Sequence, residues 1–515
     1  MFLFLFVPLG GAALAAAAVL SEPRWPQNGL HLPLYRTVTR RATKRDAGTA
    51  AVGLGDVLDV TYNVLVEVGG VATPLVFDSG SADLWVISDA CTGSCTAGVP
   101  LYPQSTFQPS GMDVHLLYGD SHTGTHAIGP IGKDRAGLAG LNTNDQYFAA
   151  ITDTNTTVLD TGSAGIFGIG FPPISVLWRQ LLQAELKQNP PSAQSHAKRV
   201  EPPVLAATLQ RDTVDVGGNV GQLSIGALPN GISDDALTWA PLRAYTVAEG
   251  GLPPPPDAPS EVYPLVWEIP LDDVYFNGVK LGRSKLSPAN ISLSALIDTG
   301  NSLIRGPQDV LNQIQSMLTS SSGSGTFPCS EPQNLTFQIG GKLFPVDPRD
   351  FVHQTFTDSV DVCSPALAVT DPPTQGSGFL YGWSLGDPLL KSVLVAFHYG
   401  NLTHPSQDPP RIGLLSTLPS DASDKLQAVV GQAQAGDGNF IVTSEPAPSG
   451  TFLPTSVGVG GVPQATRLQP GPDQPQTTSD SSSALSSLSY SSESQRHTLV
   501  VALGTLLLGL GLLGI

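Results

Sequence analysis

Two short segments of this chain share a pattern in which an apolar strand runs directly into an acidic residue, a hydroxyl residue and a glycine. The segments are Pro74–Ser81 (PLVFDSGS) and Ala295–Ser302 (ALIDTGNS). A carboxylate beside an apolar core is costly unless it is paired. The repeat therefore predicts two related lobes, which contribute the carboxylates of Asp78 and Asp298 to one shared site.

The sequence around the repeat predicts a mostly β fold. Residues 62–68 alternate between apolar and polar side chains, Gly69-Gly70 is typical of a turn, and residues 73–77 are expected to form a second strand. Short strands separated by Gly, Asn, Asp and Pro continue to about residue 415. Helical patterns are few, and the clearest cover residues 175–188 and 307–318.

The length and charge of the chain limit its organisation and its partners. A chain of 515 residues can form more than one hydrophobic core, and we expect an N-terminal β lobe at 46–236 and a C-terminal β lobe at 237–418. A Pro-rich loop is expected at 252–264. The formal net charge of −18 disfavours nucleic acid as a partner, because both molecules would be anionic.

The first 45 residues have the composition of segments that are removed during export. Residues 1–20 are almost continuously apolar and offer the pattern Ala16-x-Ala18, so we expect a cleaved signal peptide; a transmembrane anchor is the alternative. Residues 21–45 end in the basic pairs Arg40-Arg41 and Lys44-Arg45. They are predicted to be a short prosegment, with a plain basic loop as the alternative.

The C-terminal part of the sequence predicts a stalk and a lipid anchor. Residues 419–497 are poor in large apolar side chains and rich in Ser, Thr, Gly and Pro, which is typical of a disordered stalk. Residues 498–515 are an uncharged apolar run that follows a spacer and small residues. This order indicates a GPI signal with attachment at Ser482, and a tail anchor is the alternative. Four N-x-[ST] sequons, which suit a secreted glycoprotein, begin at Asn155, Asn290, Asn334 and Asn401.

Two carboxylates held close together have a defined chemistry. They cannot both ionise cheaply, so at acidic pH they share one proton and titrate as a unit. One member can then act as general base on a water molecule while the other protonates a substrate carbonyl. This chemistry uses neither a cofactor nor a metal.

The segments around the two acids resemble those of the pepsin-like aspartic endopeptidases, the A1 family, over roughly residues 57–415. The resemblance implies a bilobal fold of two pseudo-symmetric β lobes with the active-site cleft between them. It also implies a monomer that hydrolyses protein or peptide substrates. With its predicted lipid anchor, the layout is similar to that of fungal yapsin-like proteases. The segments that carry the resemblance are Asp78–Val86, Leu116–Asp120, Ala164–Phe171, Asp298–Pro307, Ser384–Leu390 and the pair Cys329/Cys363.

The resemblance assigns roles to individual residues. It makes Asp78 and Asp298 the catalytic pair, Tyr118 the tyrosine of the flap, which is a hairpin that closes over substrate, and Trp85 its hydrogen-bond partner. The alternative for Tyr118 and Trp85 is that both are ordinary core aromatics. The residues expected to support the acids and the flap are Ser79, Gly80, Ser81, Gly119, Thr299, Gly300 and Asn301.

The four cysteines of an exported protein are expected to form two disulfides, although three pairings are possible. We expect Cys91–Cys95 and Cys329–Cys363, the latter as the C-lobe disulfide of the resemblance. A four-cysteine zinc site is the competing interpretation. The second pair lacks the short spacing of such sites, and an exported protein meets an oxidising compartment.

A third segment, Asp160-Thr161-Gly162-Ser163, also matches the acidic motif. It follows only a weak strand pattern and runs directly into Ala164–Phe171, which the resemblance assigns as the strand behind Asp78. Asp160 is therefore not expected to be catalytic.

Two residues depart from the family's pattern. Ser79 replaces the commoner threonine and keeps the hydroxyl. Asn301 replaces the hydroxyl residue that usually hydrogen-bonds the outer oxygen of the second aspartate, whereas Ser81 keeps that role in the first lobe. We expect the amide of Asn301 to donate to Asp298 with a different reach, and so to shift its pKa or lower its efficiency. The alternative function is a catalytically impaired pepsin-like surface binding protein.

Overall fold

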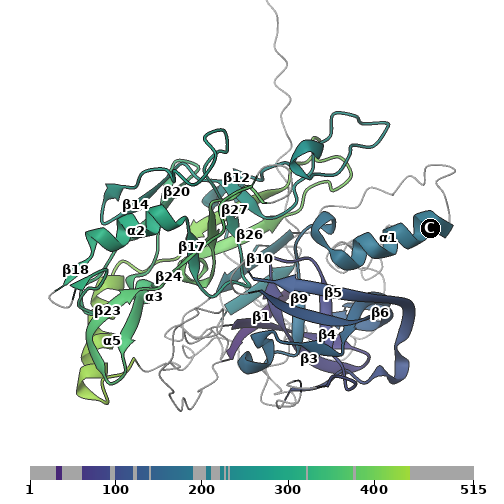
Figure 1. The fold of residues 1–515 in the computed structure, drawn as a ribbon, viewed down its shortest axis with the longest axis horizontal. Coiled ribbons are helices and arrows are strands. Elements are labelled where there is room, and N and C mark those ends of the chain that lie inside the picture. Colours follow the sequence, from purple (N-terminus) through teal and green to yellow (C-terminus); the bar gives the residue numbers. More distant parts are fainter. Residues whose placement is uncertain are drawn as a thin grey trace, which may run out of the picture.

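The computed structural model describes residues 30–37, 61–92, 95, 99–119, 124–138, 141–188, 204–209, 221–225, 228–229, 232–320, 323–374 and 379–440. Within these residues the fold is mostly β and has two lobes, as predicted (Figure 1). In Figure 1 the N-terminal lobe is drawn in purple and blue and the C-terminal lobe in teal and green. Among the helices of this described part, none has the length and apolar character that crossing a membrane requires.

One long sheet runs through the N-terminal lobe and into the junction between the lobes. Its strand order is β12-β27-β26-β10-β11-β1-β2-β3-β9-β4-β7-β6-β5, and β8 pairs with β6. Strands β10 and β26 lie between the lobes (Figure 1). The strands of this sheet are β1 (Leu30–Thr37), β2 (Thr61–Val68), β3 (Val71–Asp78), β4 (Leu84–Ile87), β5 (Gln108–Tyr118), β6 (Thr125–Leu138), β7 (Leu141–Ile151), β8 (Asp153–Thr154), β9 (Gly165–Gly168), β10 (Val204–Leu209), β11 (Gly221–Ile225), β12 (Thr238–Pro241), β26 (Val393–His398) and β27 (Arg411–Ser416).

The C-terminal lobe is built from smaller sheets. A five-stranded sheet in the order β13-β16-β25-β17-β24 carries the second acidic motif, and a four-stranded sheet in the order β15-β14-β20-β21 is separate from it. Two hairpins, β18-β19 and β22-β23, complete the described strands of this lobe. The bounds are β13 (Glu268–Pro270), β14 (Asp273–Phe276), β15 (Val279–Lys280), β16 (Ser294–Ile297), β17 (Ile304–Gly306), β18 (Thr319–Ser320), β19 (Gly323–Ser324), β20 (Leu335–Ile339), β21 (Lys342–Pro345), β22 (Val352–Phe356), β23 (Ser359–Pro365), β24 (Leu367–Val369) and β25 (Trp383–Leu385).

The internal repeat of the sequence corresponds to a repeat of topology. In the N-terminal lobe β3 pairs in parallel with β9, which also pairs antiparallel with β4. In the C-terminal lobe β16 pairs in parallel with β25, which also pairs antiparallel with β17. Each acidic motif therefore follows a strand that is held by a parallel neighbour, and the prediction of two related lobes is confirmed.

Aromatic side chains join the lobes behind the two motifs. The indole of Trp267 in the C-terminal lobe donates a hydrogen bond of 3.1 Å to the carbonyl oxygen of Ile169 in the N-terminal lobe. The hydroxyl of Tyr399 donates to the same oxygen. The ring of Phe171 packs on Trp267 with centroids 4.6 Å apart. One continuous hydrophobic core therefore spans both lobes.

The two helices that the sequence predicts are present. They are α1 (Val176–Gln188) and α2 (Gln308–Met317), and α2 begins directly after Pro307, as the proline predicts. Residues 252–264 form a loop whose pairing is limited to an isolated bridge between Tyr263 and Tyr245, in agreement with the predicted insertion. Two short helices, α3 (Pro348–Phe351) and α4 (Asp387–Leu390), lie in the C-terminal lobe.

The prediction of a disordered stalk beginning at residue 419 is wrong for its first part. Residues Ala422–Ala435 form a helix, α5, whose buried side chains are spaced on one face: Ala422, Leu426, Val430 and Ala433. The segment has few large apolar residues, but Ala, Leu and Gln favour helix, and a narrow apolar face is enough for packing. The remainder of the predicted stalk, residues 441–497, lies outside the described residues.

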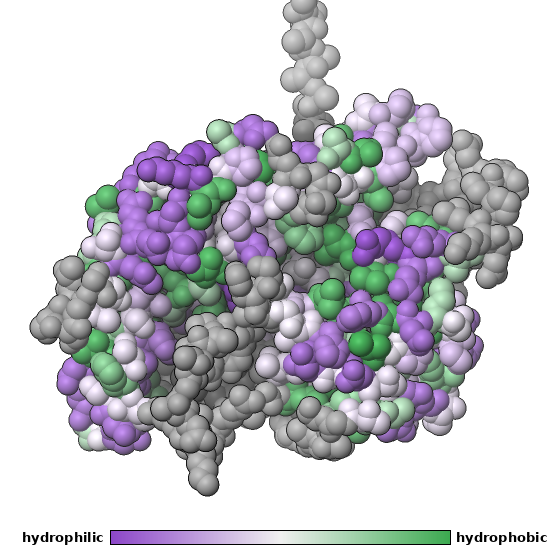
Figure 2. Space-filling model, in the orientation of Figure 1, coloured by the Kyte–Doolittle hydropathy of each residue, from purple (hydrophilic) through white to green (hydrophobic). Residues whose placement is uncertain are grey.

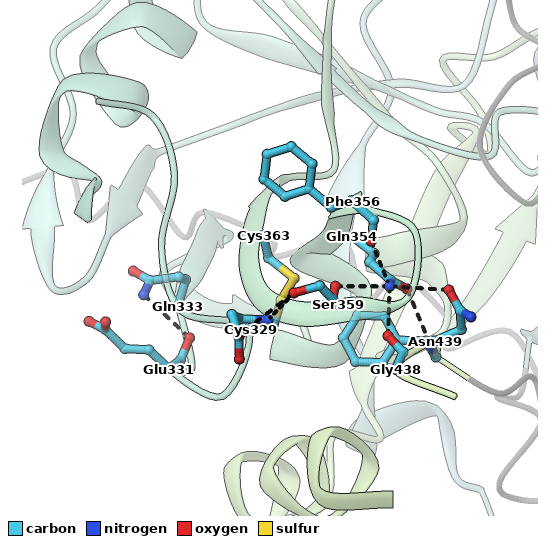
Figure 3. The surroundings of a disulfide bond; sticks show 11 residues. Cys329, Glu331, Gln333, Gln354, Phe356, Ser359, Cys363, Gly438 and Asn439 are labelled. Carbon is cyan, nitrogen blue, oxygen red and sulfur yellow. Dashed lines mark hydrogen bonds between the residues drawn. A yellow bond between two sulfur atoms is a disulfide. The ribbon is translucent and has the colours of Figure 1, made fainter. Parts of the chain in front are cut away.

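A polar network fixes the segment after α5 to the C-terminal lobe (Figure 3). The side-chain nitrogen of Gln354 on β22 donates to the carbonyl oxygens of Phe356, Ser359 and Gly438 at 2.8, 2.9 and 2.8 Å. The backbone N–H of Phe440 donates in return to the Gln354 side-chain oxygen. The folded domain therefore extends to residue 440, beyond the predicted lobe end at 418.

Strand β1 lies inside the predicted prosegment of residues 21–45. It pairs antiparallel with β11 and with β2, and so connects them in the sheet. The predicted boundary between residues 236 and 237 falls just before β12, yet β10 on one side and β26 on the other share the same sheet. The lobes therefore share backbone pairing across the predicted boundary.

Candidate active site

The two acidic motifs meet at the junction of the lobes, where their backbones brace each other. Asp78 ends β3, and Asp298 follows β16 directly. The Ser79 N–H donates to the Thr299 hydroxyl oxygen at 2.9 Å, and the Thr299 N–H donates to the Ser79 hydroxyl oxygen at 2.9 Å. The Ser79 hydroxyl in turn donates to the carbonyl oxygen of Ile297 at 2.8 Å, and the Thr299 hydroxyl donates to that of Phe77 at 2.7 Å. These reciprocal bonds between buried groups fix the relative position of the two acids.

Glycine at two positions allows the carboxylates to lie close together. A Cβ atom placed on Gly300 would lie 2.3 Å from Asp78 Oδ1, and one placed on Gly80 would lie 2.5 Å from Asp298 Oδ1. Each carboxylate therefore occupies the space beside the glycine of the other motif, as expected for these two residues.

Asp78 is the better stabilised of the two carboxylates. It is 6% exposed, and it accepts hydrogen bonds from the Gly80 N–H at 2.8 Å and from the Ser81 hydroxyl at 2.5 Å. Burial raises the pKa of Asp78, and the bonds from Ser81 and Gly80 oppose that rise. Ser81 thus makes the contact that the sequence predicts.

Asp298 is held by longer hydrogen bonds. Its Oδ1 accepts from the Gly300 N–H at 3.1 Å, and its Oδ2 accepts from the Ser384 hydroxyl at 3.4 Å. Burial raises the pKa of Asp298 to about 7, and the negative charge of Asp78 contributes to the rise. The longer hydrogen bonds of Asp298 and the direction of this pKa shift both favour Asp298 as the carrier of the proton that the pair shares.

The prediction that Asn301 donates to Asp298 is wrong. The Asn301 amide Nδ2 donates instead to the Ser384 hydroxyl oxygen at 2.9 Å, and its Oδ1 accepts from the Leu303 N–H at 3.1 Å. The donor to the outer oxygen of Asp298 is Ser384, on the neighbouring strand β25. The hydroxyl missing from position 301 is thus present 83 residues later.

A β-hairpin formed by β5 and β6 carries Tyr118 at its end, and Leu117 and Tyr118 line the same pocket as the two acids. The indole N–H of Trp85 donates to the Tyr118 hydroxyl at 2.7 Å, which confirms the predicted hydrogen bond. Gly119 follows with φ of 90°, a left-handed conformation that glycine adopts without strain, where the hairpin turns. Burial raises the pKa of Tyr118, so its hydroxyl stays protonated.

The acids line a cleft of about 580 Å³, to which both lobes contribute residues. Leu117 of the hairpin is 73% exposed and borders this cleft. Toward the middle of the molecule, hydrophobic residues reach the surface between hydrophilic ones (Figure 2). The apolar lining residues include Val76, Leu116, Leu117, Val158, Ile166, Ile174, Val176, Leu296 and Phe379.

The remaining residues singled out by the sequence have the following places. The backbone of Asp160 lies in a 3-10 helix, Thr157–Thr161, and not at the end of a strand. The disulfides Cys91–Cys95 and Cys329–Cys363 are both formed, so the predicted pairing is confirmed. Of the four sequon asparagines, Asn155, Asn290 and Asn334 are exposed and Asn401 is half-buried. Ser482 lies outside the described residues.

The sequence assigned no role to Asp83, which lies five residues after Asp78 in the same segment. Its buried carboxylate accepts from the Ser175 hydroxyl at 2.5 Å and from the N–H groups of Val176 and Leu177 at 3.0 and 3.1 Å. A carboxylate suits the N-terminus of a helix, because the unpaired N–H groups there carry partial positive charge. Asp83 therefore fixes α1 to the loop that carries Asp78.

Comparisons with known proteins agree with this geometry. Residues 61–404 match the family model described as eukaryotic aspartyl protease. The chain is similar to Major aspartyl peptidase 1 of Cryptococcus neoformans, with 26% identity over 383 residues that cover 70% of this chain and 71% of the relative. It is also similar to Cathepsin E-A of Xenopus laevis, with 27% identity over 410 residues that cover 77% and 88% of the two chains. An aspartic protease of Phaffia rhodozyma is 26% identical over 356 residues, which cover 65% of this chain and 73% of the relative.

Proposed function

The chain belongs to the eukaryotic aspartyl protease family and is an aspartic endopeptidase, and we propose that Asp78 and Asp298 are the two acids that perform its chemistry. The observation that carries the proposal is their mutual approach. Each carboxylate lies against the glycine of the opposite motif, and hydroxyl bonds between Ser79 and Thr299 brace the two loops.

The differing hydrogen bonds of the two acids support different roles. Asp78, with the shorter bonds, is the ionised general base and removes a proton from a water molecule, whose oxygen attacks the substrate carbonyl carbon. Asp298 donates its proton to the carbonyl oxygen. The C–N bond then breaks as Asp78 passes its proton to the leaving nitrogen, and Asp298 regains a proton from a hydroxyl of the intermediate.

The expected substrate is a peptide bound in the cleft under the Tyr118 hairpin, with apolar side chains near the scissile bond. The apolar lining on both sides of the acids supports this preference. The expected pH range is acidic. The pKa of Asp298 is raised to about 7, so its proton is lost and activity falls as the pH rises through that value.

Substitution of the acids tests the proposal in the full chain. We expect Asp78→Asn and Asp298→Asn each to lower kcat/KM by at least about 10²-fold, because each removes one member of the acid–base pair. Asp160→Asn is the matched control and should retain activity. Circular dichroism and thermal unfolding check that the variants fold. An inactive Asp160→Asn variant together with an active Asp78→Asn variant would contradict the assignment of Asp78 as a catalytic acid.

The alternative function, a catalytically impaired binding protein, was supported only by the replacement of a hydroxyl residue by Asn301 beside the second acid. The Ser384 hydroxyl, which donates to Asp298, removes that support. A wild-type protein that binds peptides but cleaves none between pH 3 and pH 7 would favour the alternative.

We also propose that the enzyme is exported and attached to the cell surface by a GPI anchor, in a layout similar to that of yapsin-like proteases. Two disulfides suit an oxidising compartment. The apolar compositions of residues 1–20 and 498–515, which lie outside the described residues, support a signal peptide and an anchor signal. Phosphatidylinositol-specific phospholipase C should release the protein from intact cells. Recovery of the protein only from the cytosol would contradict the proposal.

A further inference from the structure

We infer that Ser384 is a positioning residue for Asp298, and that Asn301 orients its hydroxyl. The inference rests on the proposed function of the two acids. In the second lobe, the hydrogen bond to the outer oxygen of the acid comes from Ser384 on a neighbouring strand. In the first lobe, the equivalent bond comes from Ser81 in the loop of the acidic motif itself.

The two lobes differ at one matched position. Ser81 lies three residues after Asp78, and its hydroxyl donates to Asp78 Oδ2 at 2.5 Å. Asn301 lies three residues after Asp298, but the Leu303 N–H holds its Oδ1 at 3.1 Å. The amide nitrogen donates to the Ser384 hydroxyl oxygen at 2.9 Å.

The hydrogen-bond directions determine where the Ser384 proton points. Asn301 Nδ2 has only hydrogens to offer, so the Ser384 oxygen must accept that bond. The hydroxyl hydrogen of Ser384 is then available to Asp298 Oδ2, which is 3.4 Å away. Both Ser384 and Asn301 are 4% exposed, so water does not readily take the place of either partner.

The backbone of Ser384 is held rigidly, as a positioning role requires. Strand β25 is the central one of three: Ser384 is in register with Leu296 on β16 and with Arg305 on β17. The strand that places the hydroxyl is therefore paired in parallel with the strand that leads into Asp298.

As a consequence, we expect each of the two serines to set the position of a different limb of the pH–activity profile. Ser81 stabilises the charge of Asp78, whose protonation ends activity at low pH. Ser384 stabilises the charge of Asp298, whose deprotonation ends activity at high pH. A lost donor disfavours the charged form and so raises the pKa of its own acid. Removal of each hydroxyl should therefore move a different limb of the profile upward.

The test measures kcat/KM against pH for the full chain and its variants with a peptide substrate. Ser384→Ala should move the alkaline limb upward by about half to one pH unit, the size expected for one hydrogen bond, and leave the acidic limb in place. Ser81→Ala should instead move the acidic limb upward. Ser384→Thr keeps the hydroxyl and should keep the wild-type profile.

A second pair of variants tests the part played by Asn301. Asn301→Ala leaves the Ser384 hydroxyl without its orienting donor, so the alkaline limb should move in the same direction by a smaller amount. In the Ser384→Ala background, Asn301→Thr places a hydroxyl at the position equivalent to Ser81 and should return the limb toward the wild-type pH.

The outcomes separate this inference from the proposed function. If Asp298→Asn is inactive but the alkaline limb of both Ser384→Ala and Asn301→Ala is unmoved, the role of Ser384 is refuted and the role of Asp298 stands. If Ser384→Ala moves both limbs alike, the hydroxyl does not act on Asp298 alone and the inference is overturned. An active Asp298→Asn variant overturns both.

Discussion

Glycine at positions 80 and 300 sets how closely the two acids can approach. We expect Gly300→Ala to lower kcat/KM by at least about 10²-fold, because its Cβ would lie 2.3 Å from Asp78 Oδ1 and would displace the carboxylate. Gly382→Ala is the matched control, since its Cβ would meet its nearest neighbour, Pro307, at 3.8 Å. The measurement is kcat/KM at one acidic pH, with thermal unfolding to verify the fold. Equal activity of the two variants would contradict the close approach.

At the residue scale, the sequence predicts contacts within a motif but not contacts between distant strands. The bond from Ser81 to Asp78 follows from spacing alone, because three residues of a tight loop return the chain to its acid. The Asn301 side chain has the same spacing, yet its amide oxygen accepts from the Leu303 N–H and its amide nitrogen donates to Ser384. Ser384 lies in a segment that resembles the family, and the missing hydroxyl at position 301 is the sequence feature that could have indicated its role.

At the scale of elements, helix α5 distinguishes a folded domain end from a stalk. Gly431 lies in the interior of α5, and a Cβ there would meet no atom within 4 Å. Gly431→Ala should therefore raise the free energy of unfolding by about 0.5–1 kcal/mol, because alanine loses less backbone entropy in a helix. Val430→Asp, on the buried face, should lower it. Thermal and urea unfolding measure both, and two unchanged variants would indicate that α5 contributes nothing to the fold.

The elements also show where pattern reasoning is sufficient. Alternating strands and the Pro-led helix α2 follow from local sequence, because their periodicity and end signals are strong. Helix α5 was missed because its buried face is narrow, with Leu426 and Val430 between two alanines, and the segment resembles a low-complexity linker in composition. Strand β1 was missed because its partners, β11 and β2, are set by tertiary pairing and not by its own residues.

At the scale of the whole molecule, one tryptophan connects the strands that carry the two acids. The Trp267 carbonyl oxygen accepts from the Ile297 N–H at 3.0 Å, next to Asp298. Its indole donates to the Ile169 carbonyl oxygen, and the Ile169 N–H donates to the carbonyl oxygen of Asp78 at 2.8 Å. Trp267 therefore links the backbone next to Asp298 to the backbone next to Asp78, and so helps to fix the position of the two acids relative to each other.

Trp267→Ala tests that connection. The loss of a fully buried indole should lower the free energy of unfolding by about 3–5 kcal/mol. It should also lower kcat/KM by at least about tenfold at temperatures where the protein is still folded, because the two acids lose their alignment. Phe351→Ala is the control: this ring packs on Phe276 and Phe327 within the C-terminal lobe, so it should reduce stability and leave kcat/KM nearly unchanged. Calorimetry and kinetics on the same samples separate the two effects. If both variants lose stability and neither loses activity, the alignment of the acids does not depend on the aromatic contact between the lobes, and the reciprocal bonds of Ser79 and Thr299 maintain it alone.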